Sequence, residues 1–171
     1  MISVFELFKI GIGPSSSHTV GPMKAAAAFV EGLVATGALE ATAGVTVDLY
    51  GSLAFTGKGH AVDKALVLGL SGETPARVDP DEADRIFLAA RATRSLRLGG
   101  RRAIAFDPAS AINFDLIAQP KRHPNTLRLR AFDASDATLA DETWCSVGGS
   151  FILREDAADL EGAAAVSYPH P

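Results

Sequence analysis

A polar turn that runs straight into an apolar helix constrains the fold of this chain more than any other feature. Residues 10–22 read Ile-Gly-Ile-Gly-Pro-Ser-Ser-Ser-His-Thr-Val-Gly-Pro, and an alanine-rich stretch follows. The pattern predicts a helix from about His18 to Ala35, which Gly37 ends. The polar cluster then lies at a helix N-terminus, where unpaired N–H groups and roughly half a positive charge attract a carboxylate or phosphate. One serine suffices to cap a helix, so an anion site and a plain cap both stay open.

The composition favours a single domain that contacts neither nucleic acid nor membrane. With 171 residues and 47% hydrophobic content, the chain can form one core that buries roughly 70% of its unfolded surface. The net charge of −4 offers no basic face to a nucleic-acid backbone. No apolar run approaches the ~20 residues that span a bilayer, and the first residues lack a signal peptide's pattern, so we expect a cytoplasmic protein. Cys145 is the single cysteine, which excludes an internal disulfide and a metal centre ligated wholly by thiolates of this chain.

The order of the predicted elements points to an α+β fold. Helical patterns cover 18–35 and 61–70, and Asp79-Pro80-Asp81-Glu82 is a strong helix start. Alternating or β-branched runs predict strands at 45–50, 102–106, 112–117, 127–132, 143–147 and 151–153. The last two can pair back on each other across the glycines at 148 and 149. Helices followed by antiparallel strands are typical of the α+β class.

A second glycine-rich loop is predicted at residues 51–60, between a strand and a helix. It does not fit a phosphate loop, because five residues separate Gly51 from the Gly57-Lys58 pair and Gly59 follows Lys58. What remains is a turn that presents Lys58 and His60 at a helix N-terminus. A histidine that titrates near neutrality is suited to act as a general base, and an exposed capping residue is the plainer alternative.

Two further polar turns lie in the second half of the chain. His123-Pro124-Asn125 is predicted first of all as a plain strand connection, since proline stiffens it and asparagine tolerates left-handed geometry. Gly148 and Gly149 either allow a ligand or another backbone to approach closely or form a bulge.

Together, four segments resemble the β domain of the iron–sulfur L-serine dehydratases. The segments are residues 5–22, Gly51-Ser52-Leu53 with residues 56–60, His123-Pro124-Asn125, and Ser146-Val147-Gly148-Gly149. The resemblance covers nearly the whole chain. It implies a mixed, largely antiparallel sheet with helices packed on one side, similar to the intervening regulatory domain of D-3-phosphoglycerate dehydrogenase. It also implies that residues 1–154 form the β domain and 155–171 a linker toward a missing α domain.

The resemblance implies conversion of L-serine to pyruvate and ammonia, without pyridoxal phosphate, at a [4Fe-4S] cluster whose cysteines lie in a separate α domain or subunit. Elimination of water needs a Lewis acid at the β-hydroxyl, a base for the Cα proton and an anchor for the carboxylate. By resemblance, His60 is the base and Lys58 its neighbour, and no metal ligand is expected in this chain. The residues implied to bind substrate are Ser15, Ser16, Ser17, His18 and Thr19. Those implied to form an effector site or a pocket wall are His123, Asn125, Gly148 and Gly149.

The sequence raises two other possible functions. The similarity to a regulatory domain implies the alternative that the chain is a stand-alone serine-binding or dimerisation module, and a homodimer is expected in either case. A serine hydrolase that uses Ser16 or Ser17 with His18 is disfavoured, because adjacent residues at a helix start are expected not to face each other and no Gly-x-Ser-x-Gly elbow occurs.

Overall fold

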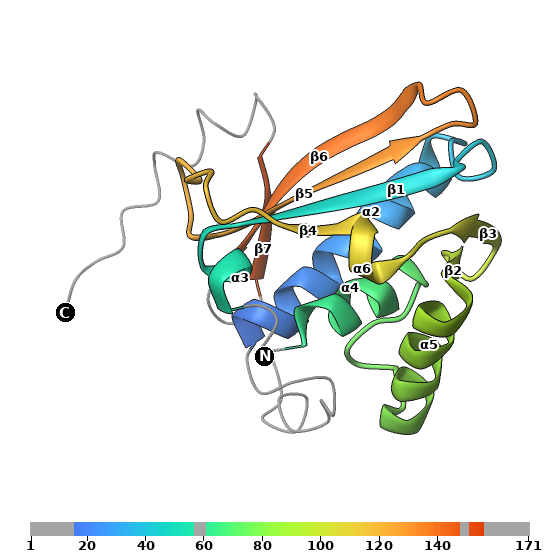
Figure 1. The fold of residues 1–171 in the computed structure, drawn as a ribbon, viewed down its shortest axis with the longest axis horizontal. Coiled ribbons are helices and arrows are strands. Elements are labelled where there is room, and N and C mark those ends of the chain that lie inside the picture. Colours follow the sequence, from blue (N-terminus) through green and yellow to red (C-terminus); the bar gives the residue numbers. More distant parts are fainter. Residues whose placement is uncertain (1–15, 57–60, 148–150, 156–171) are drawn as a thin grey trace.

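The computed structural model describes residues 16–56, 61–147 and 151–155, and for Ser16 only the backbone. It contains one five-stranded sheet with helices on one face and a two-stranded hairpin beside them (Figure 1). The elements are η1 (Ser16–Val20), α2 (Gly21–Ala35), β1 (Gly44–Tyr50), α3 (Gly51–Thr56), α4 (Val62–Leu70), α5 (Pro80–Thr93), β2 (Ser95–Leu98), β3 (Arg102–Ala105), α6 (Pro108–Ala111), β4 (Ile112–Phe114), β5 (Asn125–Phe132), β6 (Thr138–Val147) and β7 (Phe151–Arg154). The α+β class is confirmed.

The large sheet has the strand order β4-β1-β5-β6-β7. Strand β4 runs parallel to β1, whereas β1–β5, β5–β6 and β6–β7 are antiparallel, so the expected mixed and largely antiparallel sheet is confirmed. Along β1, Val45, Val47 and Leu49 are buried and their neighbours are partly exposed, which is the period of two expected of a strand with one face on the core.

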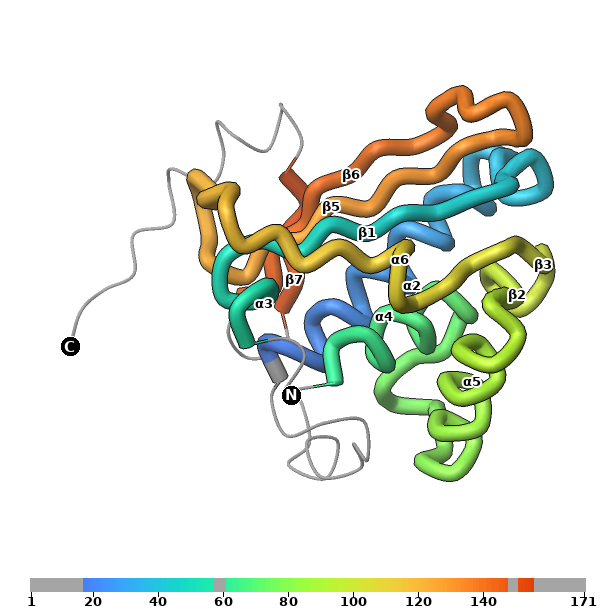
Figure 2. Tube along the Cα trace, viewed as in Figure 1, coloured from blue at the N-terminus to red at the C-terminus, as the bar shows by residue number. Residues whose placement is uncertain are grey.

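Helix α2 packs against the inner face of this sheet, and α4 packs closely against α2, as the Cα trace also shows (Figure 2). The close approach follows from small residues: Ala25, Ala26 and Gly69 are on the two helices, and a Cβ on Gly69 would stand only 2.3 Å from the carbonyl oxygen of Met23. The core therefore lies between the sheet and this helix pair.

The outer face of the sheet is polar at its centre. Arg128 on β5 forms a two-point ion pair with Asp141 on β6, with nitrogen–oxygen distances of 2.8 and 2.6 Å. Arg130 donates to Asp48 on β1 at 2.9 Å. These cross-strand pairs explain why the outer positions Asp48, Arg128 and Arg130 carry charges instead of the apolar residues of the inner face.

Several local predictions are confirmed in detail. The side chain of Asp79 caps α5 by accepting the backbone N–H groups of Asp81 and Glu82, at 2.9 and 3.2 Å. Gly37, just after α2, has a positive φ of 73°. The strands predicted at 143–147 and 151–153 do pair with each other, as parts of β6 and β7.

Other local predictions were wrong. Residues 51–56, predicted as part of a loop, form helix α3, and Asn125, predicted in a turn, begins strand β5. The strand predicted at 112–117 stops at Phe114, because the Asp115 carboxylate accepts the backbone N–H groups of Ile117 and Ala118 and forms a turn. Strand β2 was not predicted. The N-terminal segment and most of the predicted linker lie outside the described residues.

Candidate functional site

A hydrogen-bonded chain of side chains joins the first polar segment to the second. His18 lies in the π-helical turn η1, and its Nδ1 is 2.8 Å from the hydroxyl of Ser17. Its Nε2 is 3.0 Å from the hydroxyl of Ser52, at the start of α3. In a neutral imidazole one ring nitrogen donates and the other accepts, so the two hydroxyls must play opposite roles. The expectation that adjacent residues here do not face each other was therefore wrong for Ser17 and His18.

The second polar segment is fixed to the third through the backbone. The N–H of Ser52 donates to the carbonyl oxygen of Pro124 at 2.7 Å, and Gly51 forms an isolated β-bridge with Asn125. Gly51 has a φ of +54°, and a Cβ there would stand 2.5 Å from the Pro124 oxygen. Only glycine suits both this backbone conformation and this close approach. Gly51 thus allows Ser52 to lie directly against the His123-Pro124-Asn125 segment.

That third segment is internally ordered as well. The backbone N–H of Asn125 donates to Nδ1 of His123 at 3.0 Å, and the Thr126 hydroxyl donates to the His123 carbonyl oxygen at 2.6 Å. Because Nδ1 of His123 accepts a hydrogen bond, the neutral ring carries its proton on Nε2. The segment therefore presents the ring in one tautomer.

The fourth segment meets the third across the sheet. Thr126 on β5 is opposite Cys145 on β6, so the next pair in the antiparallel ladder is Asn125 and Ser146. Residues opposite each other in a ladder point to the same face of the sheet. Ser146 is fully buried, and β6 contacts the turn η1 that carries His18.

Two polar atoms in this region are buried without a hydrogen-bond partner in the described part of the chain: Oδ1 of Asn125 and Oγ of Ser146. Buried polar groups are nearly always hydrogen-bonded, and each exception calls for an explanation. We define the polar cluster as Ser17, His18, Ser52, Asn125 and Ser146. Figure 1 shows that its elements meet at one end of the sheet, where η1, α3 and the ends of β5 and β6 converge.

Cys145 lies next to this cluster but on the opposite face of the sheet. Burial, and then a hydrogen bond from its thiol to Glu155 at 3.0 Å, raise the pKa of Cys145 to about 12. The residue is therefore a thiol at neutral pH, and a thiolate is what a metal ligand must be. Within residues 16–56, 61–147 and 151–155 there is no group of three or more His, Cys, Asp or Glu side chains that could hold a metal ion.

The candidate residues predicted from the sequence have different outcomes. Ser17, His18 and Asn125 lie in the polar cluster, His123 is adjacent to it, and Thr19 is fully buried beside His18. The candidates that lie outside the described residues, or whose side chain does, are Ser15, Ser16, Lys58, His60, Gly148 and Gly149. Ser52 and Ser146 were within the quoted segments but were not singled out.

The fold and the polar cluster define an α+β domain whose polar side chains converge from four segments at one end of its sheet. A family profile described as serine dehydratase beta chain matches residues 3–157. The chain belongs to this family.

Curated relatives agree with this assignment. The chain is 44% identical to the L-serine dehydratase TdcG of Escherichia coli K12, over 99% of this chain and 37% of that protein. It is 42% identical to L-serine dehydratase 1 of the same organism, over 100% and 37%, and 44% identical to an L-serine dehydratase of Streptomyces coelicolor, over 94% and 35%. The chain thus spans little more than a third of the length of these relatives. No helix among the described residues is long and apolar enough to cross a membrane.

Proposed function

We propose that this chain is the β portion of an L-serine ammonia-lyase, which converts L-serine to pyruvate and ammonia together with a separate α domain or subunit. The observation that carries the proposal is the polar cluster, because His18, Ser52, Asn125 and Ser146 come from distant segments and meet at one end of the sheet. The family and the names of its relatives support the choice of reaction.

The polar cluster suits a small zwitterion. Of the two hydroxyls bonded to His18, the one that accepts the imidazole N–H donates its own hydrogen to the substrate carboxylate, and the buried Oδ1 of Asn125 accepts from the substrate ammonium. In this proposal the segment from Ser15 to Thr19 anchors the carboxylate. His60 removes the Cα proton with Lys58 beside it.

A [4Fe-4S] cluster supplies the Lewis acid for departure of the hydroxyl in this proposal. The described residues do not fit as its ligands, since the single cysteine is buried as a thiol on the opposite face of the sheet from the polar cluster. We therefore assign the cluster to the separate domain and route no step of this chain through it. Cytoplasmic location, a homodimer and independence from pyridoxal phosphate are further parts of the proposal.

The sharpest test compares two buried hydroxyls that both lack a hydrogen-bond partner among the described residues. Ser146 lies in the polar cluster, whereas Thr46 is on β1, opposite Arg130 and away from it. In the complete enzyme, we expect Ser146→Ala to lower kcat/KM for L-serine by about tenfold or more, because a hydrogen bond to a charged group is worth ~1.5–3 kcal/mol. We expect Thr46→Val to leave kcat/KM within about twofold. Equal effects of the two variants would refute the substrate-binding role of the polar cluster.

A second measurement separates the half-site enzyme from the serine-sensing module. The melting temperature of this chain alone is measured with L-serine and with D-serine as the control. A complete site at a hundredfold excess of ligand over Kd adds ~2.7 kcal/mol, or roughly 5–10 °C. A stereospecific rise favours the sensor, whereas no rise favours a pocket completed by the other domain.

A further inference from the structure

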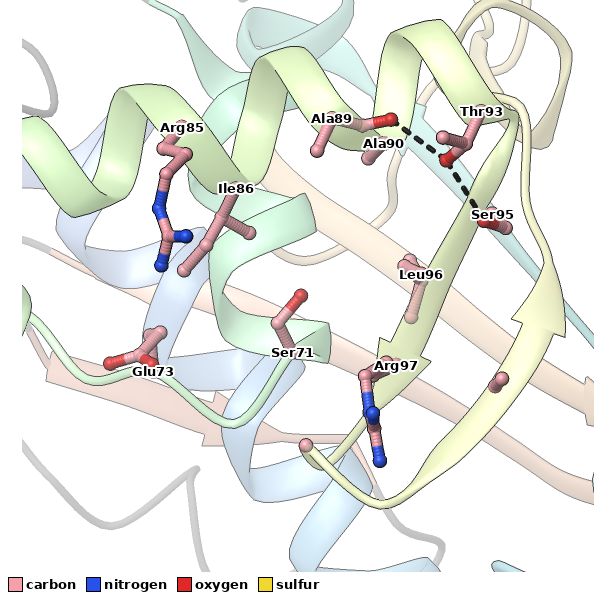
Figure 3. Close-up of a pocket in the computed structure, with 12 residues that line it drawn as sticks. Ser71, Glu73, Arg85, Ile86, Ala89, Ala90, Thr93, Ser95, Leu96 and Arg97 are labelled. Atoms are coloured by element: carbon pink, nitrogen blue, oxygen red, sulfur yellow. Dashed lines mark hydrogen bonds between the residues drawn. The ribbon is translucent and has the colours of Figure 1, made fainter.

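A second candidate site lies far from the polar cluster, between α5 and the β2–β3 hairpin. Here the structure forms a groove of about 410 Å³, within the range of roughly 300–1,000 Å³ that is typical of small-molecule sites. Its wall is apolar and consists of Ile86, Ala89 and Ala90 on α5 and Leu96 on β2 (Figure 3). Figure 1 places these elements at the opposite end of the domain from α3.

The rim of this groove carries two charges of opposite sign. The carboxylate of Glu73 and the guanidinium of Arg97 both line the groove, and neither forms a hydrogen bond or ion pair with a described residue. Arg85, also at the rim, is held by Glu82, to which its Nε donates at 3.0 Å. Figure 3 shows Glu73 and Arg97 apart along the same rim, with Ser71 between them.

The hydroxyls of the groove act as acceptors toward a ligand. The hydroxyl of Ser71 donates its only hydrogen to the carbonyl oxygen of Val67 at 2.7 Å. Thr93 likewise donates to the Ala89 carbonyl oxygen at 2.8 Å, so Ser95, whose oxygen is 2.9 Å from that of Thr93, must be the donor of that pair. The exposed lone pairs of these oxygens suit a cationic donor.

We propose that this groove binds a free α-amino acid with an aliphatic side chain. Arg97 pairs with the carboxylate, and Glu73 and the Ser71 oxygen accept from the ammonium. The aliphatic side chain lies on the apolar wall formed by α5 and Leu96, so a hydroxylated side chain such as that of serine should bind more weakly. The site is separate from the polar cluster and does not depend on the function proposed for it.

The test is a titration of the ¹⁵N-labelled chain followed by amide chemical shifts, with L-leucine as the probe. Two analogues each lack one charge: 4-methylpentanoate lacks the ammonium and 3-methylbutylamine lacks the carboxylate. We expect saturable shifts at the amides of Ser71, Glu73, Leu96 and Arg97 with L-leucine, and at least tenfold weaker binding of both analogues. No saturable shift up to about 10 mM L-leucine, or equal binding of either analogue, overturns the proposal.

Substitutions in the lining test whether L-leucine binds in this groove. We expect Arg97→Gln and Glu73→Gln each to raise Kd for L-leucine at least tenfold, whereas Arg101→Gln, at the turn of the same hairpin but outside the lining, leaves Kd unchanged. Ala89 is exposed on α5, so Ala89→Phe can fill the groove without disturbing the core, and it should abolish the shifts. Unchanged binding in Arg97→Gln or in Ala89→Phe refutes the site, and failure of the Ser146→Ala test leaves this result unaffected.

Discussion

Replacing Gly69 with alanine tests the close packing of α2 against α4, on which the core depends. A Cβ at this position would stand 2.3 Å from the carbonyl oxygen of Met23, 2.8 Å from Cβ of Ala26 and 3.2 Å from the backbone nitrogen of Ala27. Two of these three atoms belong to the backbone of α2, so no side-chain rotation can relieve the clash. The two helices must move apart along a contact most of whose side chains are buried.

Two opposing contributions decide whether Gly69→Ala raises or lowers the unfolding free energy. In an exposed helix, glycine to alanine stabilises by roughly 1 kcal/mol. Overpacking a tight contact costs about 1–3 kcal/mol and occasionally more, and a separation of 2.3 Å places Gly69 at the upper end. The net effect is a loss of about 2 kcal/mol of unfolding free energy. For a chain of this size that corresponds to a melting temperature about 4–8 °C lower.

The same chain offers a matched control in Gly32, which also lies within a helix. Among the described residues, a Cβ on Gly32 would meet only Oε1 of Glu142, at 3.7 Å, which is ordinary van der Waals contact. Gly32→Ala should therefore raise the unfolding free energy by up to ~1 kcal/mol. Thermal and urea unfolding followed by circular dichroism measure both variants. A Gly69→Ala variant that melts at or above the wild-type temperature would refute the packing argument.

Three further predictions concern the neighbourhood of the polar cluster. Gly51 has a φ of +54°, and Gly51→Ala places a Cβ 2.5 Å from the carbonyl oxygen of Pro124. We therefore expect a lower melting temperature and shifted amide signals of Ser52 and Asn125. An unchanged amide spectrum contradicts this prediction. The thiol pKa of Cys145 is about 12, so its alkylation at pH 8 should be at least tenfold slower in the folded chain than in urea. The raised pKa of the Cys145 thiol stabilises the folded state fully at a pH below the unfolded-state pKa of about 8.5, and this stabilisation is lost as the pH rises toward 12. Between pH 8 and 10, the wild type should therefore lose more unfolding free energy than Cys145→Ala does. Equal losses would contradict the raised pKa.

Those elements that carry their own local signals were predictable from the sequence. Asp79 followed by proline and two acids fixes the start of α5, and the alternation in residues 45–50 fixes β1. In both cases, the information lies within a few residues, because a cap satisfies local N–H groups and a period of two defines a strand face. The overall class followed from the order of such elements.

Elements that depend on distant contacts were not predictable in the same way. Helix α3 begins with a glycine and follows a strand without a break, and its Ser52 N–H donates to Pro124, which is remote in sequence. Strand β2 has only four residues, although Gly99 and Gly100, both with positive φ, do mark a hairpin turn after it. The hairpin signal was therefore present, and the strand was missed because its sequence, Ser-Leu-Arg-Leu, contains no β-branched or aromatic residue.

Two residues of the polar cluster were likewise not predicted as site residues. A lone serine such as Ser52 or Ser146 carries no local signal, and His18 meets Ser52 across 34 residues of sequence. The register of β5 and β6, with Thr126 opposite Cys145, makes Ser146 the partner of Asn125. A slip of one residue would turn Ser146 to the outer face and bring Cys145 into the cluster instead. The register of these two strands, more than the four segments themselves, therefore determines which side chains can meet a ligand.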